Sequence, residues 1–128
     1  MTNEEAVTKF LSDYYAAFST LNIQDILPYF HEPALLVGPL GVIPLPTPAA
    51  VVPIFGPVME NLRRRQYGQS ELKLQQLKLL SATSALAIGV AVRLKTDGQE
   101  LERAGITYLV HKTESGWKFA VVVLHDAD

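Results

Sequence analysis

The sequence contains no cysteine among its 128 residues. This absence excludes a disulfide framework, a thiol nucleophile and a thiolate metal site, and it is compatible with a reducing cytoplasm. Positive charge is not in excess either, since the formal net charge is -2, so we expect no nucleic-acid partner. No apolar run is long enough for a membrane span, and residues 1–5 are polar and acidic, unlike a secretory leader. We therefore expect a soluble cytoplasmic protein with no membrane partner, folded as one domain over residues 1–128.

Cofactor and metal signatures are also missing. No glycine-rich loop leads from a strand into a helix, and no serine stands in a nucleophile-elbow motif. His31-Glu32 and His125-Asp126 are adjacent pairs, whose side chains point to opposite faces of a strand and do not readily bind one ion. We expect neither a metal nor a cofactor.

Helical signals dominate the first half of the chain. Thr2 followed by Glu5 is a capping-box pattern, with Asn3 as a competing cap. Apolar residues then recur at helical spacing, with Tyr14 in the middle of their stripe and Tyr15 at its margin. The members of the stripe are Val7, Phe10, Leu11, Tyr14, Phe18 and Leu21.

Three further segments follow before the strands. A short second helix is predicted over residues 23–30, bent or restarted by Pro28. Residues 34–43 read as a small hairpin beside the main sheet. Residues 47–65 are predicted to form a helix that the prolines bend or divide, with Gly68 as its natural stop.

The second half reads as four long antiparallel strands. Over residues 71–80 the alternation slips at Gln75-Gln76, which predicts a β-bulge. Asp97-Gly98 predicts a two-residue turn, which pairs Lys95 with Glu100 and Arg93 with Glu102.

A second turn follows at residues 113–116. A glycine bulge at Gly116 would place Thr113 opposite Trp117 and His111 opposite Phe119. The pattern as a whole predicts an α+β architecture with helices packed on one face of a curved sheet.

The two turns sort the strand side chains into two faces. One face carries large aliphatic residues and the other carries mostly small ones, and both are apolar, so neither simply faces water. We assign the pocket to the large-aliphatic face and a second subunit to the other, which predicts a homodimer through the outer sheet face. The residues predicted for the dimer face include Ala85, Ala87, Ala91, Ile106, Tyr108, Val122 and Leu124.

The order of elements resembles the nuclear-transport-factor-2-like (NTF2-like) superfamily. The helix-1 tyrosine, the stretch Phe30-His31-Glu32-Pro33-Ala34 and the ending Gly116-Trp117-Lys118-Phe119 carry this resemblance. Within the superfamily the chain looks most like small bacterial SnoaL-like and ketosteroid-isomerase-like proteins. The resemblance implies a cystatin-like cone, with helices on a curved and mainly antiparallel sheet, a deep apolar pocket and frequent dimerisation.

The steroid isomerases within this superfamily use a carboxylate base with a tyrosine and a protonated aspartate as hydrogen-bond donors. Tyr14 falls at the matching tyrosine, but the base position falls at or near Gly38 and the second donor acid at Thr107. Glycine has no side-chain proton acceptor, and a threonine hydroxyl is a weaker donor than a carboxylic acid. The resemblance therefore argues against steroid isomerase activity and leaves the pocket in place.

Tyr14, Arg103 and His125 are the predicted catalytic residues. Histidine acts as acid or base near neutral pH, arginine holds an oxyanion, and tyrosine donates a hydrogen bond. The alternative, nonfunctional roles are a solvated histidine for His125, an ion pair with Glu102 or Asp126 for Arg103, and a core position for Tyr14. The residues predicted to bind the ligand are Tyr29, Val90, Thr107, Leu109, Val121 and Val123.

Two functions remain open from the sequence. The first is binding of a small apolar or aromatic molecule, with acid-base chemistry such as isomerisation, cyclisation or dehydration. The second is a noncatalytic module that binds a ligand or serves as a dimerisation scaffold.

Overall fold

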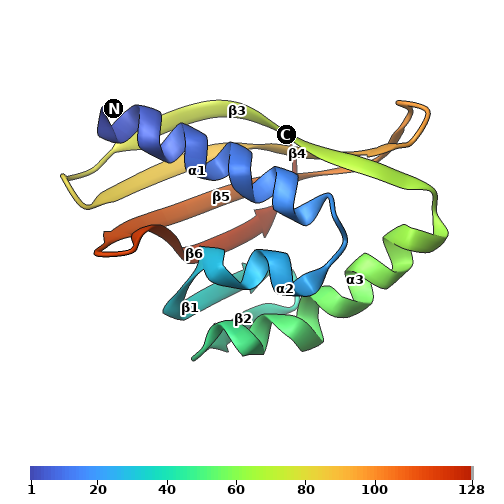
Figure 1. Ribbon diagram of the computed structural model, residues 1–128, viewed down its shortest axis with the longest axis horizontal. Helices are drawn as coiled ribbons and strands as arrows, with labels where there is room; N and C mark the ends of the chain where they lie inside the picture. Colours follow the sequence, from blue (N-terminus) through green and yellow to red (C-terminus); the bar gives the residue numbers. More distant parts are fainter. Residues whose placement is uncertain (128) are drawn as a thin grey trace.

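The computed structural model describes residues 1–127. Figure 1 shows helices packed on one strongly curved sheet, the α+β arrangement that the sequence predicts. The elements are α1 (Asn3–Phe18), α2 (Ile23–Ile26), the 3-10 helix η1 (Leu27–Tyr29), β1 (Phe30–Gly38), β2 (Gly41–Leu45), the 3-10 helix η2 (Pro48–Val51), α3 (Val52–Arg64), β3 (Tyr67–Leu79), β4 (Ser84–Lys95), β5 (Glu100–Thr113) and β6 (Gly116–His125).

Helix α1 begins with the predicted capping box. The Thr2 hydroxyl accepts a hydrogen bond from the backbone N–H of Glu5, and the Glu5 carboxylate accepts one from the backbone N–H of Thr2, both at 3.1 Å. The helix ends at Phe18, earlier than the apolar stripe, and Leu21 is buried beyond it with φ of 56°. Tyr15, predicted at the margin, is as buried as Tyr14 at 7% exposure.

The proline-rich segments divide as predicted. Residues 23–30 split into α2 and η1, with Pro28 in the second part, and the following helix splits into η2 and α3, with Pro57 inside α3. The chain turns after α3 at Gln66, whose φ is 60°, and Gly68 already lies in β3. The predicted stop at Gly68 is therefore placed two residues too late.

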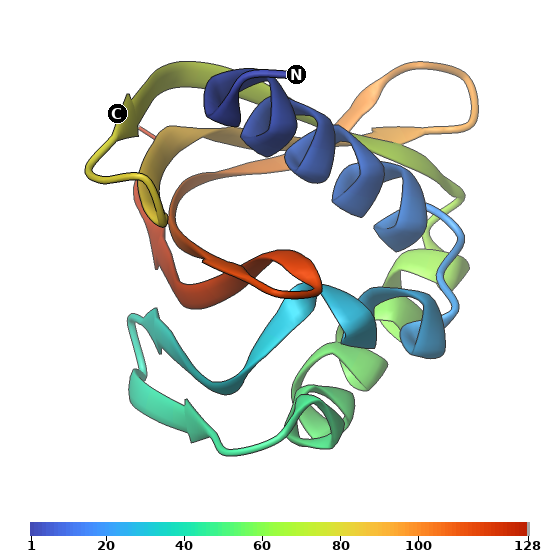
Figure 2. The same ribbon diagram turned by 60° about the vertical axis from the view of Figure 1, so that its left-hand side comes forward.

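Within residues 1–127 the strands form one six-stranded sheet in the order β2-β1-β6-β5-β4-β3. The hairpin of β1 and β2 joins the sheet because β1 runs parallel to β6, whereas the other neighbours are antiparallel. Figure 2 shows the sheet curling from β3, beside α1, to β2, beside α3, so that the helices close the open side of the curve. The predicted bulge in β3 is confirmed by a register shift between Leu74 and Gln76.

The first hairpin is longer by one residue than predicted. The backbone N–H of Gly98 donates to the carbonyl oxygen of Lys95 at 3.0 Å, and Gly98 has φ of 89°. This is the geometry of a turn with a glycine bulge, which inserts one residue into the register. The pair of Lys95 with Glu100 is therefore wrong, whereas Arg93 opposite Glu102 is confirmed.

The second hairpin is shorter than predicted. Thr113 pairs with Gly116 rather than with Trp117, and the register then shifts before the middle of β6. Phe119 consequently pairs with Val110 instead of His111, and its side chain is fully buried in the core. Beyond the shift, the predicted register of β5 and β6 is confirmed.

The assignment of the two sheet faces is wrong, because the helices cover the face with the small residues. The aromatic side chains of α1 pack against the concave side of the sheet, and the small residues of β4 make room for them there. The large aliphatic residues alternate with these along the same strands and therefore lie on the outer, convex face. Strand residues buried in the core under the helices include Ala85, Ala87, Ile106, Tyr108, Val110, Phe119 and Val122.

None of the helices in residues 1–127 is both long and apolar enough to cross a membrane.

Candidate ligand-binding site

A cavity of about 390 Å³ lies between α1, α3 and the concave face of the sheet. A volume of this order suits a small organic molecule, for which pockets run from roughly 300 to 1,000 Å³. Most of the wall is apolar and comes from both helices and from four strands. The apolar lining residues are Phe18, Leu36, Pro39, Ile54, Phe55, Val58, Ala91, Ala104, Ile106, Val122 and Leu124.

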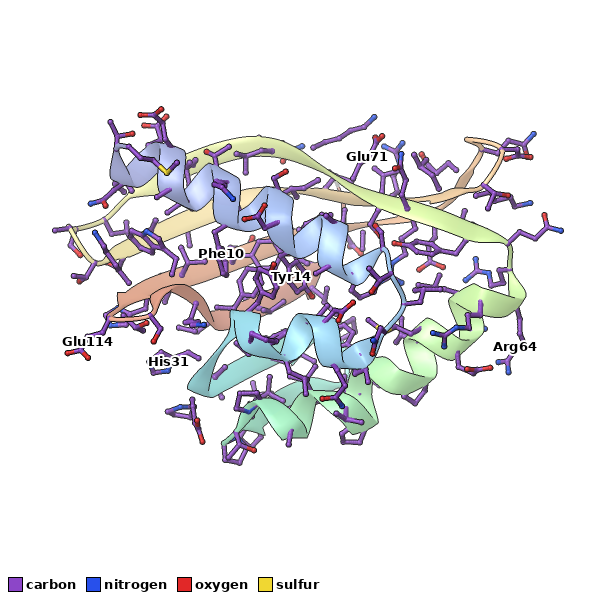
Figure 3. All side chains as sticks on the ribbon, viewed as in Figure 1. Phe10, Tyr14, His31, Arg64, Glu71 and Glu114 are labelled. Carbon is purple, nitrogen blue, oxygen red and sulfur yellow. The ribbon has the colours of Figure 1, made fainter. Side chains whose placement is uncertain are left out.

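Tyr14 is fixed in this wall by a cluster of aromatic rings. Its ring stands edge-on to Phe119 with 4.7 Å between centroids, a favoured aromatic geometry. Figure 3 shows Tyr14 among the side chains between α1 and the sheet. The other rings around it belong to Tyr15, Phe18, Tyr29, Phe30 and Tyr108.

The hydroxyl of Tyr14 opens into the cavity. Within residues 1–127 this hydroxyl has no hydrogen-bond partner. Among the same residues, the one fully buried side-chain polar atom without a partner is Trp117 Nε1, so the Tyr14 hydroxyl is not fully buried. Burial raises the pKa of Tyr14 well above its ordinary value. The site therefore holds an uncommitted, neutral O–H donor against an apolar wall.

The hydroxyls of the two other tyrosines that line the cavity form a hydrogen bond with each other. The hydroxyls of Tyr15 and Tyr108 are 2.7 Å apart, so one donates to the other. Burial raises the pKa of Tyr15 to about 12 and that of Tyr108 well above its ordinary value. Both remain protonated at neutral pH, and their pair joins α1 to β5 under the cavity.

An ion network stands at one end of the cavity. Glu102 accepts hydrogen bonds from Nη1 of Arg93 at 2.9 Å and from Nη1 of Arg65 at 2.6 Å. Arg93 also lies over the ring of Phe18, with Cζ 5.3 Å from the centroid. The network fixes the Arg93 guanidinium at the wall of the cavity.

The three predicted catalytic residues all line the cavity, and two of them, His125 and Arg103, are engaged by other residues. The imidazole Nε2 of His125 lies 2.8 Å from the hydroxyl of Thr107, a residue of the outer face. Arg103 donates through Nε to Glu100 at 2.9 Å, rather than to Glu102 or Asp126. Of the three, Tyr14 is the one whose polar group has no hydrogen-bond partner among residues 1–127.

None of the six residues predicted to bind the ligand lines this cavity. Tyr29 borders a separate groove beside α1, and Thr107 lies beside His125 on the convex face. The others alternate with cavity-lining residues on their strands, so the same reversal of faces moves them outward. They are Val90, Leu109, Val121 and Val123.

Sequence reasoning missed several lining residues. Arg93 and Glu102 were identified as a cross-strand ion pair, but not as part of the site, and Tyr108 was assigned to packing or an interface. The signal that could have found them is residue size, because the alanines of β4 leave space that a helix with aromatic side chains can fill. Among residues 1–127 there is no group of three potential metal ligands.

A family model described as NTF2-like protein (DUF6841) matches residues 3–127. The chain belongs to this NTF2-like family. No curated protein sequence matches it significantly. Family membership confirms the predicted superfamily and shows the fold, without identifying a ligand.

Solved structures are similar to this NTF2-like chain along nearly its whole length. A ketosteroid isomerase-like protein from Erwinia carotovora atroseptica SCRI1043 has 16% identity and a TM-score of 0.70, with 98% of this chain and 96% of the other covered. An NTF-2 like protein of unknown function from Shewanella oneidensis MR-1 has 14% identity and a TM-score of 0.74, covering 95% and 98%. A protein from Thiobacillus denitrificans ATCC 25259, described as a calcium/calmodulin-dependent protein kinase type II association domain, has 16% identity and a TM-score of 0.73, covering 93% of each chain. At these identities the similarity shows the fold alone.

Proposed function

We propose that this protein binds a small molecule with an apolar or aromatic body in the cavity between α1, α3 and the sheet. The observation that carries the proposal is the Tyr14 hydroxyl, an uncommitted donor on a residue that is 7% exposed. A ligand that covers this hydroxyl would leave it desolvated and unpaired, which costs free energy, unless a ligand oxygen or nitrogen accepts its hydrogen bond. The ligand therefore carries at least one acceptor beside its apolar body.

The rings around the site favour an aromatic or similarly flat body. Phe18 and Phe55 line the cavity and pack edge to face, with 6.2 Å between centroids. Burial of apolar ligand surface against such walls contributes roughly 25 cal/mol per Å². Most of the affinity comes from this burial, and Tyr14 selects the orientation.

Binding is the function that the geometry supports best, and acid-base chemistry stays a prediction. Tyr14 is suited to polarise a carbonyl oxygen, as a neutral donor in an apolar site. A proton acceptor is harder to assign, since both oxygens of Glu102 accept from arginines and the His125 ring lies by Thr107. A loss of turnover in Tyr14→Phe that is larger than its loss of affinity would establish catalysis.

The test uses 2-naphthamide as a probe, since it combines a flat apolar body with one carbonyl acceptor. Isothermal titration should detect binding to the wild type, and Tyr14→Phe should weaken it about 5- to 10-fold, the effect of one neutral hydrogen bond. Tyr29→Phe is the matched control and should leave the affinity unchanged, because Tyr29 lies outside the cavity. Equal affinities for the wild type and Tyr14→Phe would contradict the proposal.

We further propose that the convex face associates with a second copy of this chain. Apolar side chains alternate outward along β4, β5 and β6, where Leu86, Leu109 and Val121 are half-buried, and they continue onto β1, where Leu35 opposite Val121 is 39% exposed. Charged residues such as Lys73 and Lys78 lie on the edge strand β3, so the centre of the face is apolar. Proteins rarely leave large apolar patches exposed unless a partner covers them. The Thiobacillus denitrificans protein described as an association domain shares this fold.

This second proposal changes which residues test dimerisation. Val122, predicted for the interface, lines the cavity, whereas Val121 faces outward. Native mass spectrometry should show a dimer for the wild type and a monomer for Val121→Arg. Glu114→Arg in the hairpin turn is the control that should stay dimeric. A monomeric wild type would contradict the proposal.

A further inference from the structure

Arg93 has donors that the protein does not use. A guanidinium carries five N–H donors, and within residues 1–127 Arg93 makes one hydrogen bond, through Nη1 to Glu102. Its side chain is 24% exposed and lines the cavity. Stacking on Phe18 and the bond to Glu102 hold the guanidinium in place, so an incoming group meets donors that are already oriented.

The polar groups at this end of the cavity are mostly donors. Tyr14 offers an O–H, and Arg93 lies over the ring of Phe18, whose centroid is 6.3 Å from that of the Tyr14 ring. The acceptor among them, Glu102, is shared by Arg65 and Arg93, which leaves one net positive charge in this group of three. The other carboxylate of the lining, Asp126, follows β6 and is separated from Arg93 by strand β5.

We infer that the ligand is an amphipathic carboxylic acid, with its apolar body in the cavity and its carboxylate on Arg93. This inference rests on the proposed binding function and names the class of molecule for the same site. A carboxylate accepts two parallel N–H donors of a guanidinium, which a single neutral carbonyl cannot do. An uncharged ligand would leave these partly buried donors without partners, so the site discriminates by charge as well as by shape.

The experiment compares 2-naphthoate with 2-naphthamide, which share a body and differ in charge at pH 7.5. Titration calorimetry of the full chain should show that the wild type binds the acid at least 10-fold more tightly than the amide. Arg93→Gln should weaken binding of the acid about 10- to 100-fold, the range for charged hydrogen bonds, and should change binding of the amide less than 3-fold. Arg93→Lys should restore part of the affinity for the acid.

Controls separate a local effect from a general loss of charge or fold. Arg64 is exposed on α3, and Figure 3 shows it on the outside of the molecule, so Arg64→Gln should leave both affinities unchanged. The comparison of acid and amide in the wild type does not depend on any variant folding. Equal binding of acid and amide would overturn the carboxylate inference while the binding function stands. Absence of binding by both probes would overturn both.

Discussion

Removing the hydroxyl of Tyr14 should leave the stability of the fold nearly unchanged, whereas removing that of Tyr108 should lower it. Both tyrosines are buried, at 7% and 2% exposure. They differ in partners, because Tyr108 shares a 2.7 Å hydrogen bond with Tyr15 and Tyr14 has no partner among residues 1–127. Tyrosine-to-phenylalanine substitutions at the two positions therefore delete the same atom from different environments.

The expected magnitudes follow from this difference. Tyr108→Phe leaves the Tyr15 hydroxyl unpaired, which costs about 1 to 2 kcal/mol of unfolding free energy. At about 2.1 cal/mol/K per residue, 1 kcal/mol corresponds to roughly 4 °C in Tm for a chain of this length. We expect a decrease of about 4 to 7 °C for Tyr108→Phe and a change within about 2 °C for Tyr14→Phe.

Circular dichroism melting curves and urea titrations of the two variants provide the assay. Tyr15→Phe should resemble Tyr108→Phe, because it breaks the same hydrogen bond from the other side. The reasoning fails if Tyr14→Phe is destabilised as much as Tyr108→Phe, since the Tyr14 hydroxyl would then have a partner in the protein.

Two further predictions concern the pH dependence of stability and the effect of His125 on ligand affinity. The pKa of Tyr15 in the folded state is about 12, above that of an unfolded tyrosine. The contribution of neutral, buried Tyr15 to the free energy of unfolding is therefore intact below pH 10. It is lost between pH 10 and 12, by about 1.4 kcal/mol per pH unit. Tyr14 and Tyr108 act in the same direction. Urea titrations from pH 8 to 12 should show this fall, and a flat profile would be inconsistent with the buried tyrosines. His125→Ala should leave the affinity for 2-naphthamide within about 2-fold in calorimetry, because the two ring nitrogens of His125 already lie 2.8 Å from the Thr107 hydroxyl and from the Asp126 carbonyl oxygen. A larger loss would place that ring in the site.

The sequence predicted the order of the elements because local signals determine them. The capping box of Thr2, the prolines that divide the helices and the bulge near Gln76 are all short-range features. The pairing of Arg93 with Glu102 was predictable for the same reason, since a turn next to it sets the register.

The choice of the buried face was not predictable from alternation alone. Both faces of the strands are apolar, so hydrophobicity does not distinguish them, and the deciding factor is the fit between α1 and a concave surface. The small side chains of Ala87 and Ala91 leave room for the aromatic residues of the helix, a relation between segments far apart in the sequence. Val122 therefore lines the pocket, whereas the sequence had predicted Val121 for this role.

The reversed assignment of the two sheet faces also affected the prediction of the site. Tyr14 lines the cavity because its position on the helix determines its direction. His125 also lines the cavity, although the strand register had placed it on the face that is convex in the structure. Arg93 was recognised only for its ion pair, since the number of its unused donors depends on the folded structure.

Methyl-selective NMR of the protein titrated with 2-naphthoate tests the central claim most directly. Neighbouring residues of one strand report opposite faces, because Ile106, Val122 and Leu124 line the cavity, whereas Leu109, Val121 and Val123 alternate with the lining residues on the same strands. We predict ligand-dependent shifts at the first group and at Ile54 of α3, with small changes at the second. Shifts at Val121 and Val123 without shifts at Val122 would contradict a ligand site on the concave face.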